Sequence, residues 1–246
     1  MAALRFHDLT LGYERHPAVH HLDGAVENGA LLAVIGPNGA GKSTLFKGIA
    51  GAISPLAGSI ERNGFNPRDI AYLPQVPDID RSFPINVYDM VAMGLWRKKG
   101  LFGGIGGKDR DAIEHALAAV GLTGFEQRAI GTLSGGQMQR TLFARLLLQD
   151  ARVIVLDEPF TATDERTAAD LLDLVRRWHG EKRTVLAALH DIDLVKANFP
   201  ATLLLAREPV AWGATADVIT TENLSKARRM CEAFDDQAAA CLPEMA

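Results

Sequence analysis

The chain has 246 residues, 48% apolar and 23% charged, with a formal net charge of −4. This suits one α/β domain or two small ones, and the acidic balance argues against a nucleic-acid-binding protein, which normally carries a basic excess. No apolar run is long enough to span a membrane, and the N-terminus shows no signal peptide. Two cysteines, Cys231 and Cys241, are too few for a disulfide framework and suit a reducing cytosol.

Short apolar runs alternate with helical patterns along most of the chain. Strands are expected at residues 4–10, 18–26, 31–35, 70–73, 153–156, 184–189 and 202–206. Helices are expected at 42–50, 84–96, 109–120 and 137–149, with a flexible glycine-rich loop at 100–107. This alternation predicts an α/β fold with a mainly parallel sheet and helices on both faces, and the strand-poor segment 70–150 indicates a helical subdomain.

Residues 36–43 match the phosphate-binding pattern G-x-x-x-x-G-K-S between an expected strand and an expected helix. Glycines let successive backbone N–H groups approach phosphate oxygens, and the helix N-terminus adds partial positive charge. The strand and helix around the loop disfavour an accidental glycine-rich turn. The predicted contacts come from Gly36, Pro37, Asn38, Gly39, Ala40, Gly41, Lys42 (β- and γ-phosphates), Ser43 (Mg²⁺) and Thr44 (phosphate).

Asp157 and Glu158 follow an apolar run that reads as a buried strand. Ligands of parallel sheets bind at the carboxyl ends of the strands, so both acids are expected beside the phosphate loop. Adjacent residues of a strand point to opposite faces, so Asp157 and Glu158 could carry out two different tasks. Asp157 is expected to hold Mg²⁺ and Glu158 to orient and deprotonate the attacking water. A solvated acid pair is the alternative, and the nearby loop disfavours it.

Residues 133–140 read LSGGQMQR and resemble the signature of ATP-binding-cassette (ABC) ATPases. The resemblance covers residues 4 to about 230. It implies that a head-to-tail homodimer binds ATP together with Mg²⁺ and hydrolyses the ATP. It implies that Ser134, Gly135, Gly136 and Gln137 act on the ATP of the second subunit. A hydroxyl, glycine amides and a helix N-terminus do make an anion site. A helix capped by Ser134 is the alternative, although a cap needs neither both glycines nor this spacing from Asp157.

Four further residues match the family by order and context. Gln75 resembles the glutamine that touches Mg²⁺ and water, His190 the histidine that contacts the γ-phosphate, and Tyr13 the aromatic that stacks on adenine. Asp164 resembles the aspartate that serves communication across the dimer. Thr163 replaces the usual apolar residue before it, a departure that leaves the catalytic acids untouched. With Lys42 and Glu158, Gln75 and His190 complete the implied catalytic set.

The resemblance also implies a domain plan. Residues 1–230 would form a single ABC ATPase domain of the P-loop NTPase fold, with an N-terminal antiparallel β part. A helical subdomain at about 76–150 would be inserted in the catalytic core, and residues 231–246 would form a tail with exposed or disordered thiols.

Residues 80–94 resemble the zinc/manganese uptake branch of the family, with zinc favoured over manganese. The branch implies an importer subunit at the cytoplasmic face of the inner membrane, with a membrane permease and, indirectly, an extracytoplasmic metal-binding protein. Trp96, Leu101 and Phe102 are candidate permease contacts, or they pack within the helical subdomain.

The sequence leaves several alternatives open. They are an importer for iron–siderophore, heme or cobalamin, a soluble non-transport ABC ATPase, and, against the signature, a P-loop kinase. The four N-terminal histidines lack a ligand spacing and a nearby cysteine, so we expect a solvated cluster rather than a zinc site; they are His7, His16, His20 and His21.

Overall fold

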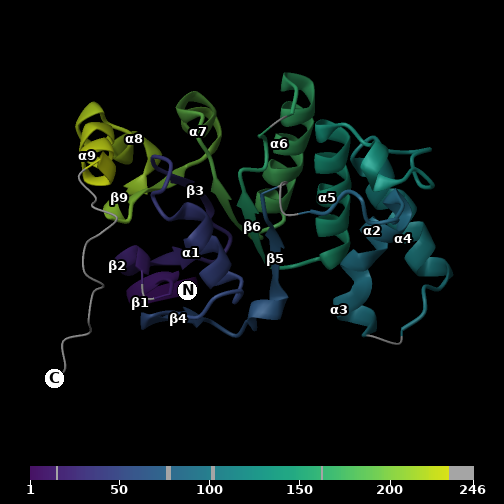
Figure 1. Cartoon of the computed structure of the whole chain (residues 1–246), viewed down its shortest axis with the longest axis horizontal. Coiled ribbons are helices and arrows are strands. Elements are labelled where there is room, and N and C mark those ends of the chain that lie inside the picture. The colour runs from purple at the N-terminus through teal and green to yellow at the C-terminus, as the bar shows by residue number, and fades with distance from the viewer. Residues whose placement is uncertain (15, 76–78, 101–102, 162, 233–246) are drawn as a thin grey trace.

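The structure is a computed structural model, and it describes residues 1–14, 16–75, 79–100, 103–161 and 163–232. Figure 1 shows the chain as an elongated α/β molecule, with the strand-rich part on the left and a group of helices on the right.

A six-stranded sheet forms the centre of the fold. Its order is β5-β6-β7-β3-β8-β9, in which the first five strands are parallel and β9 pairs antiparallel with β8. Short apolar runs form these buried strands because both faces of a parallel sheet are covered. The strands are β3 (Leu31–Ile35), β5 (Ile70–Leu73), β6 (Val153–Asp157), β7 (Thr184–Ala188), β8 (Ala201–Ala206) and β9 (Glu208–Ala214).

A three-stranded antiparallel sheet, in the order β2-β1-β4, lies at the N-terminal end of the chain. It contains β1 (Ala2–Tyr13), β2 (His16–Glu27) and β4 (Ala57–Arg62). It agrees with the expected antiparallel β part, although β1 and β2 are each 12 residues long and exceed the predicted strands.

The helices begin and end close to the predicted positions. The expected helix at 84–96 starts after the cap residue Asn86 and is divided into α2, a 3-10 turn and α3. The α-helices are α1 (Lys42–Ile49), α2 (Val87–Ala92), α3 (Trp96–Lys99), α4 (Gly107–Ala119), α5 (Gly135–Gln149), α6 (Glu165–Gly180), α7 (Ile192–Asn198), α8 (Thr215–Val218) and α9 (Thr221–Glu232). Short 3-10 turns are η1 (Pro67–Asp69), η3 (Met93–Leu95) and η4 (Ile130–Thr132). No described helix is both long enough and apolar enough to cross a bilayer.

The core divides between the two faces of the central sheet. Alternate residues of one strand enter different hydrophobic clusters, as the period of two requires. In β6, Ile154 and Leu156 join the cluster formed with helices α2, α4, α5 and α6. Val153 and Val155 join the cluster formed with α1 and the antiparallel sheet. The sheet is therefore sandwiched between two apolar layers and is fixed in position by both.

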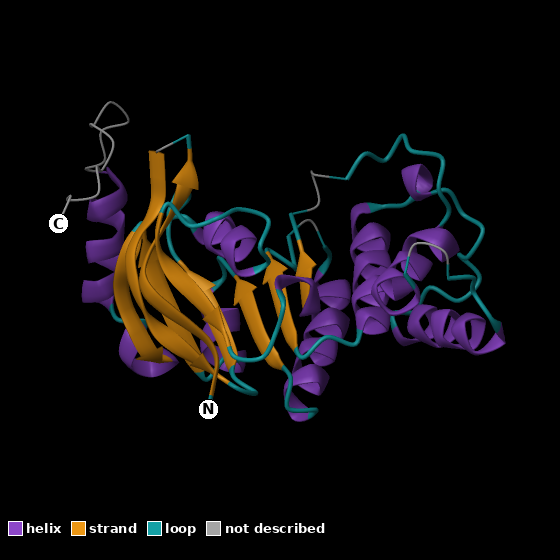
Figure 2. Ribbon diagram, turned by 90° about the horizontal axis from the view of Figure 1, so that it is seen from below, coloured by secondary structure: helices purple, strands orange, loops and turns teal. Residues whose placement is uncertain are grey.

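Helices α2 to α5 pack against one another at one end of the molecule, which Figure 2 shows as a group of helices without strands. Helix α5 contacts α2, α4, β5 and α6, so it links this helical group to the central sheet. The segment corresponds to the expected helical subdomain, whose limits stay a prediction.

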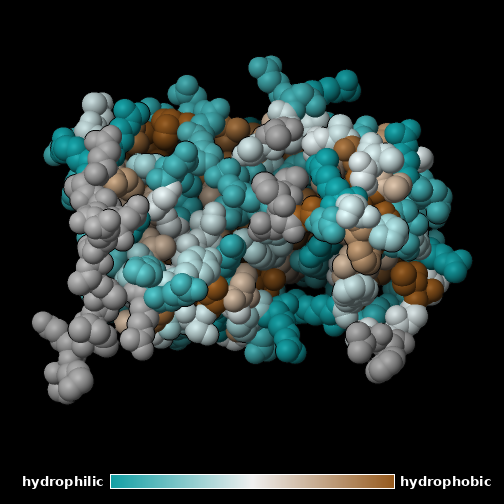
Figure 3. All heavy atoms as spheres, viewed as in Figure 1, coloured by the Kyte–Doolittle hydropathy of each residue, from teal (hydrophilic) through white to brown (hydrophobic). Residues whose placement is uncertain are grey.

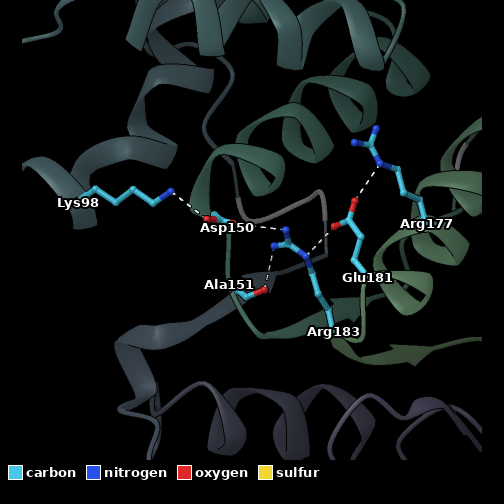
Figure 4. Close-up of polar contacts among 6 residues, drawn as sticks. All are labelled: Lys98, Asp150, Ala151, Arg177, Glu181 and Arg183. Carbon is cyan, nitrogen blue, oxygen red and sulfur yellow. Dashed lines mark hydrogen bonds and ion pairs between the residues drawn. The ribbon is translucent and has the colours of Figure 1, made fainter. Parts of the chain in front are cut away.

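Ion pairs stabilise the edge of the sheet opposite the phosphate loop (Figure 4). Arg183 donates to Asp150 at 2.9 Å, to Glu181 at 3.0 Å and to the carbonyl oxygen of Ala151 at 3.1 Å. Lys98 of α3 also contacts Asp150, at 3.3 Å. Arg183 therefore ties the connection between α5 and β6 to the connection between α6 and β7, beside an open cavity of about 560 Å³.

Candidate functional site

Four neighbouring parallel strands place the predicted site residues along one edge of the sheet. The segment 36–43 follows β3 directly, and His190 lies two residues after β7. Asp157 ends β6 with Glu158 next to it, and Gln75 lies two residues after β5. Because these strands are adjacent in the order β5-β6-β7-β3, their carboxyl ends bring together segments that are up to 154 residues apart. This edge is where parallel sheets bind ligands.

The phosphate loop has a backbone that only glycine adopts readily. Gly41 has φ 92°, and a Cβ there would lie 2.4 Å from the carbonyl oxygen of Ala18 in β2. Gly36 has φ 155°, and its Cβ would lie 2.0 Å from the carbonyl oxygen of Leu205. Both positions exclude larger residues, because conformation and close backbone contact act together.

Lys42 turns back onto the loop. Its Nζ donates to the carbonyl oxygens of Gly36 at 2.8 Å and Pro37 at 3.0 Å. Burial lowers the pKa of Lys42, while the carboxylates of Glu158 and Asp157 act in the opposite direction. The ammonium group thus lies near both acids, where it is able to exchange loop carbonyls for phosphate oxygens.

Asp157 is 2% exposed, and its Oδ1 has no hydrogen-bond partner among the described residues. The Ser43 side chain hydrogen-bonds to the Asp157 carboxyl group. The pKa of Asp157 is raised, chiefly because burial penalises the charged form and also because Glu158 is close. A buried, incompletely paired carboxylate beside a hydroxyl is a suitable donor set for Mg²⁺, which prefers oxygen ligands.

Glu158 lies just outside the strand in a left-handed conformation, with φ 50°. Its Oε1 is hydrogen-bonded to Nε2 of His190, and it also contacts the Gln75 and Thr161 side chains. Burial alone would raise the pKa of Glu158, but the His190 and Gln75 hydrogen bonds outweigh burial and lower it. β6 ends at Asp157, so Asp157 and Glu158 are not adjacent residues of one strand. The backbone turn at Glu158, rather than the predicted strand alternation, gives the two carboxyl groups different surroundings.

The LSGGQ segment forms the beginning of α5. Ser134 caps the helix by accepting from the Gln137 N–H at 3.2 Å, and the Gln137 side chain accepts from the Ser134 N–H at 3.0 Å. Ser134 therefore caps α5, as the alternative interpretation predicted, yet Ser134 remains exposed. Figure 1 shows α5 well apart from α1, with β5 and β6 between them. The segment does not face the phosphate loop of its own chain.

The remaining predicted residues lie around this arrangement. Tyr13 is 46% exposed at the end of β1, with Nζ of Lys47 at 6.0 Å from the ring centre, so it lies beside α1. Thr44 is buried in the first turn of α1. Asp164 caps α6 by accepting from the Thr167 N–H at 2.8 Å.

Apolar side chains are exposed on the helical part of the molecule. Phe83 and Trp96 are each 62% exposed, whereas Leu101 and Phe102 lie outside the described residues. In Figure 3 the visible face is mainly hydrophilic, with hydrophobic side chains in small separate groups. Trp96 thus faces solvent and does not pack within the helical group.

Two of the four N-terminal histidines pair with acids, and the ring centres of His20 and His21 lie 6.3 Å apart. His21 contacts Asp8 at 2.7 Å and His7 contacts Glu61 at 3.4 Å. Among the described residues, no group of three or more histidine, cysteine or acidic side chains is arranged to hold a metal ion. Cys231 lies in α9 and is half-buried, which differs from the prediction of an exposed tail thiol; Cys241 lies outside the described residues.

Gln139 was missed by the sequence analysis. It is 1% exposed on the inner face of α5, and its side-chain Nε2 donates to the carbonyl oxygen of Pro159 at 2.6 Å. Thr161, whose hydroxyl lies 3.3 Å from Glu158 Oε2, was missed as well. For Gln139 the sequence did offer a signal, because it is a glutamine at a helix position that the periodicity assigns to apolar side chains.

Comparison with known proteins agrees with this geometry. The family model for ABC transporters matches residues 19–161. The chain is 38% identical to the manganese transport system ATP-binding protein MntA of Synechocystis sp., covering 84% of this chain and 82% of that protein. It is 37% identical to the zinc transport system ATP-binding protein TroB of Treponema pallidum, covering 92% and 86%. Among solved structures, an inward-facing putative metal-chelate type ABC transporter aligns with a TM-score of 0.82 and 31% identity, covering 93% of this chain and 90% of the other.

Proposed function

The chain belongs to the ABC transporter family as an ATP-hydrolysing subunit, and we propose that it powers the uptake of a divalent metal ion through a separate membrane permease. The observation that carries this proposal is the similarity, over most of the chain, to ATP-binding proteins of manganese and zinc transport systems. Residues 80–94 resemble the zinc/manganese branch as a whole; zinc was the favoured cargo, and the proposal is compatible with relatives named for either metal.

The site geometry supports a specific division of labour. Lys42 and the N–H groups of the phosphate loop would bind the ATP phosphates. Asp157, Ser43 and Gln75 would hold Mg²⁺, which when bound neutralises charge on the phosphates. Glu158 would accept the proton of the attacking water, and its lowered pKa keeps it ionised at neutral pH. His190, hydrogen-bonded to Glu158, would orient that carboxylate and contact the γ-phosphate.

A second copy of the chain would complete each site. The exposed Ser134, with the backbone N–H groups at the start of α5, would meet the ATP that is bound by the opposite subunit. Tyr13 would stack on the adenine, since its ring is exposed at the rim beside α1. Asp164, at the start of α6, would serve communication across the head-to-tail dimer.

The helical group would connect ATP hydrolysis to the membrane. Gln75 lies at the site and Trp96 is exposed on α3, so a movement at the site would reach this exposed surface through the packed helices α2, α3 and α5. We assign this surface to the permease and place the subunit at the cytoplasmic face of the inner membrane. An extracytoplasmic metal-binding protein would deliver the cargo and take part only indirectly.

The test of cargo is uptake of labelled metal by chelator-treated cells with and without the gene. Loss of zinc uptake, manganese uptake or both supports the proposal and identifies the cargo. Unchanged uptake of both metals, with loss of iron–siderophore, heme or cobalamin uptake, would overturn the metal assignment and leave the ATPase assignment in place.

A further inference from the structure

The connection between β6 and α6, residues 158–164, begins at Glu158 and ends at Asp164. Glu158 adopts a left-handed backbone, which for a residue with a side chain costs roughly 1–3 kcal/mol and persists only where the surroundings impose it. Among the described residues of the connection, two hydroxyl contacts are present: Thr161 with Glu158 at 3.3 Å, and Thr163 with the Phe160 carbonyl oxygen at 2.7 Å. Both are local, so they do not fix the connection relative to the rest of the fold.

Gln139 supplies a backbone contact from outside the connection. Its Nε2 donates to the carbonyl oxygen of Pro159, the residue that directly follows Glu158, at 2.6 Å. A carbonyl oxygen only accepts, so the amide must present its nitrogen there. Gln139 is in α5, five residues after Ser134. The helix that begins with the LSGGQ segment therefore holds the backbone next to Glu158 of the same chain.

The second polar atom of Gln139 indicates that this contact has a use beyond packing. Its Oε1 is buried and has no hydrogen-bond partner among the described residues. Burying such an atom without a partner costs roughly 1–3 kcal/mol. Methionine, of similar length, would fill the same space without that penalty. Glutamine is therefore less favourable for stability than methionine at this position, but its amide provides a donor to the Pro159 carbonyl oxygen.

Arg140, the next residue, holds the other end of the connection. It contacts Asp170 at 2.6 Å and the Thr167 hydroxyl at 3.2 Å, both in α6. Thr167 in turn donates its N–H to Asp164. Gln139 and Arg140 of α5 therefore lie at opposite ends of the connection. Gln139 contacts the residue next to Glu158, and Arg140 contacts the first turns of α6.

We propose that Gln139 is a positioning residue for Glu158: by holding the Pro159 carbonyl, it keeps the Glu158 carboxylate directed toward His190 and Gln75. This inference rests on the proposed role of Glu158 as the base. Gln139 is buried and is not among the residues proposed to contact ATP or Mg²⁺. Because Gln139 is on the helix that Ser134 caps, a shift of α5 would also move Glu158 of the same chain.

The test compares Gln139→Met and Gln139→Glu with the parent and with Gln127→Glu, an exposed control outside the site. Gln139→Met removes the donor, and we expect kcat to fall by about tenfold or more, with KM for ATP within about twofold, because misplacing a catalytic group chiefly affects the chemical step. A glutamic acid donates only when protonated. The activity of Gln139→Glu relative to the parent should therefore fall as pH rises, while that of Gln127→Glu should not change with pH.

A parental kcat for Gln139→Met would overturn the inference. So would a reduced kcat in Gln139→Glu whose ratio to the parent is independent of pH, because that pattern indicates a structural role alone. If Gln139→Met fails to fold, the pH profile of Gln139→Glu decides. Glu158→Gln is measured in parallel: parental turnover in that variant would refute the role of Glu158, whereas an inactive Glu158→Gln with a parental Gln139→Met refutes only the present inference.

Discussion

Nε2 of His190 is hydrogen-bonded to Oε1 of Glu158, although 32 residues separate them along the chain. The contact exists because β6 and β7 are adjacent parallel strands that end at the same edge of the sheet. It contributes to a lowered pKa for Glu158, despite the opposing effect of burial. A carboxylate held in this way is ionised at neutral pH, which is the protonation state that a base requires.

Replacement of His190 by alanine should therefore change the pH profile of hydrolysis. Without that hydrogen bond the pKa of Glu158 rises, so the acid limb of the kcat profile moves to higher pH. Because His190 would also orient the carboxylate and contact the γ-phosphate, we expect kcat at neutral pH to fall by about 10²-fold. His115→Ala, an exposed change on α4, is the matched control. An acid limb at the parental pH in His190→Ala would contradict this account of Glu158.

The Asp157→Asn substitution should raise the stability of the metal-free protein and abolish ATP hydrolysis. The raised pKa means that the folded state binds the Asp157 proton more tightly than the unfolded state does. The free energy of unfolding therefore falls as pH rises from the ordinary value of about 3.9 to the raised one, and the penalty is complete above that interval. Asparagine carries no charge, so the metal-free variant should be more stable at neutral pH, by roughly 0.5–2 kcal/mol.

The measurement is thermal unfolding of Asp157→Asn and the parent, without metal, at neutral and acidic pH. The difference should shrink at acidic pH, where the parent carboxyl group is protonated. Hydrolysis of ATP with Mg²⁺ should be lost in the same variant. A variant less stable than the parent at neutral pH would show that burial of this charge is not the dominant effect.

Ser134→Asp tests the signature separately from the helix cap. Aspartate caps helices as well as serine does, so α5 should remain folded. Its negative charge, however, would repel a phosphate group. We expect normal thermal stability and loss of ATP hydrolysis in the purified variant.

Mixing inactive variants then tests the head-to-tail arrangement. A dimer of one Ser134→Asp copy and one Lys42→Ala copy keeps one intact site, because the normal phosphate loop of the first copy meets the normal signature of the second. The mixture should therefore regain activity that neither variant has alone. If each signature served its own chain, the mixture would stay inactive.

Arg183→Met should affect stability and leave the catalytic site unchanged. Its guanidinium is held by Asp150, Glu181 and the Ala151 carbonyl (Figure 4). Loss of these contacts should lower the free energy of unfolding by roughly 1–3 kcal/mol, with unchanged KM for ATP. Arg177→Met, at an exposed pair with Glu181, should have little effect. Equal destabilisation by the two variants would contradict the bracing role of Arg183.

The sequence predicted local features well because their causes are local. The phosphate loop needs glycines at fixed positions, and Asp157 follows an apolar run that reads as a strand. Gln75 and His190 were found only through family resemblance, since their proximity depends on the order of the strands. The contact of Gln139 with Pro159 joins residues 20 positions apart on different elements, which no periodicity reveals. The left-handed backbone of Glu158 is likewise imposed by tertiary contacts.

The role of Glu158 as the base is tested by ATP turnover of purified parent and Glu158→Gln proteins in the presence of Mg²⁺. We predict that Glu158→Gln retains ATP binding, accumulates as an ATP-bound dimer in size-exclusion chromatography and loses turnover by about 10²-fold or more. Hydrolysis by Glu158→Gln at the parental rate would contradict the assignment of Glu158 as the base.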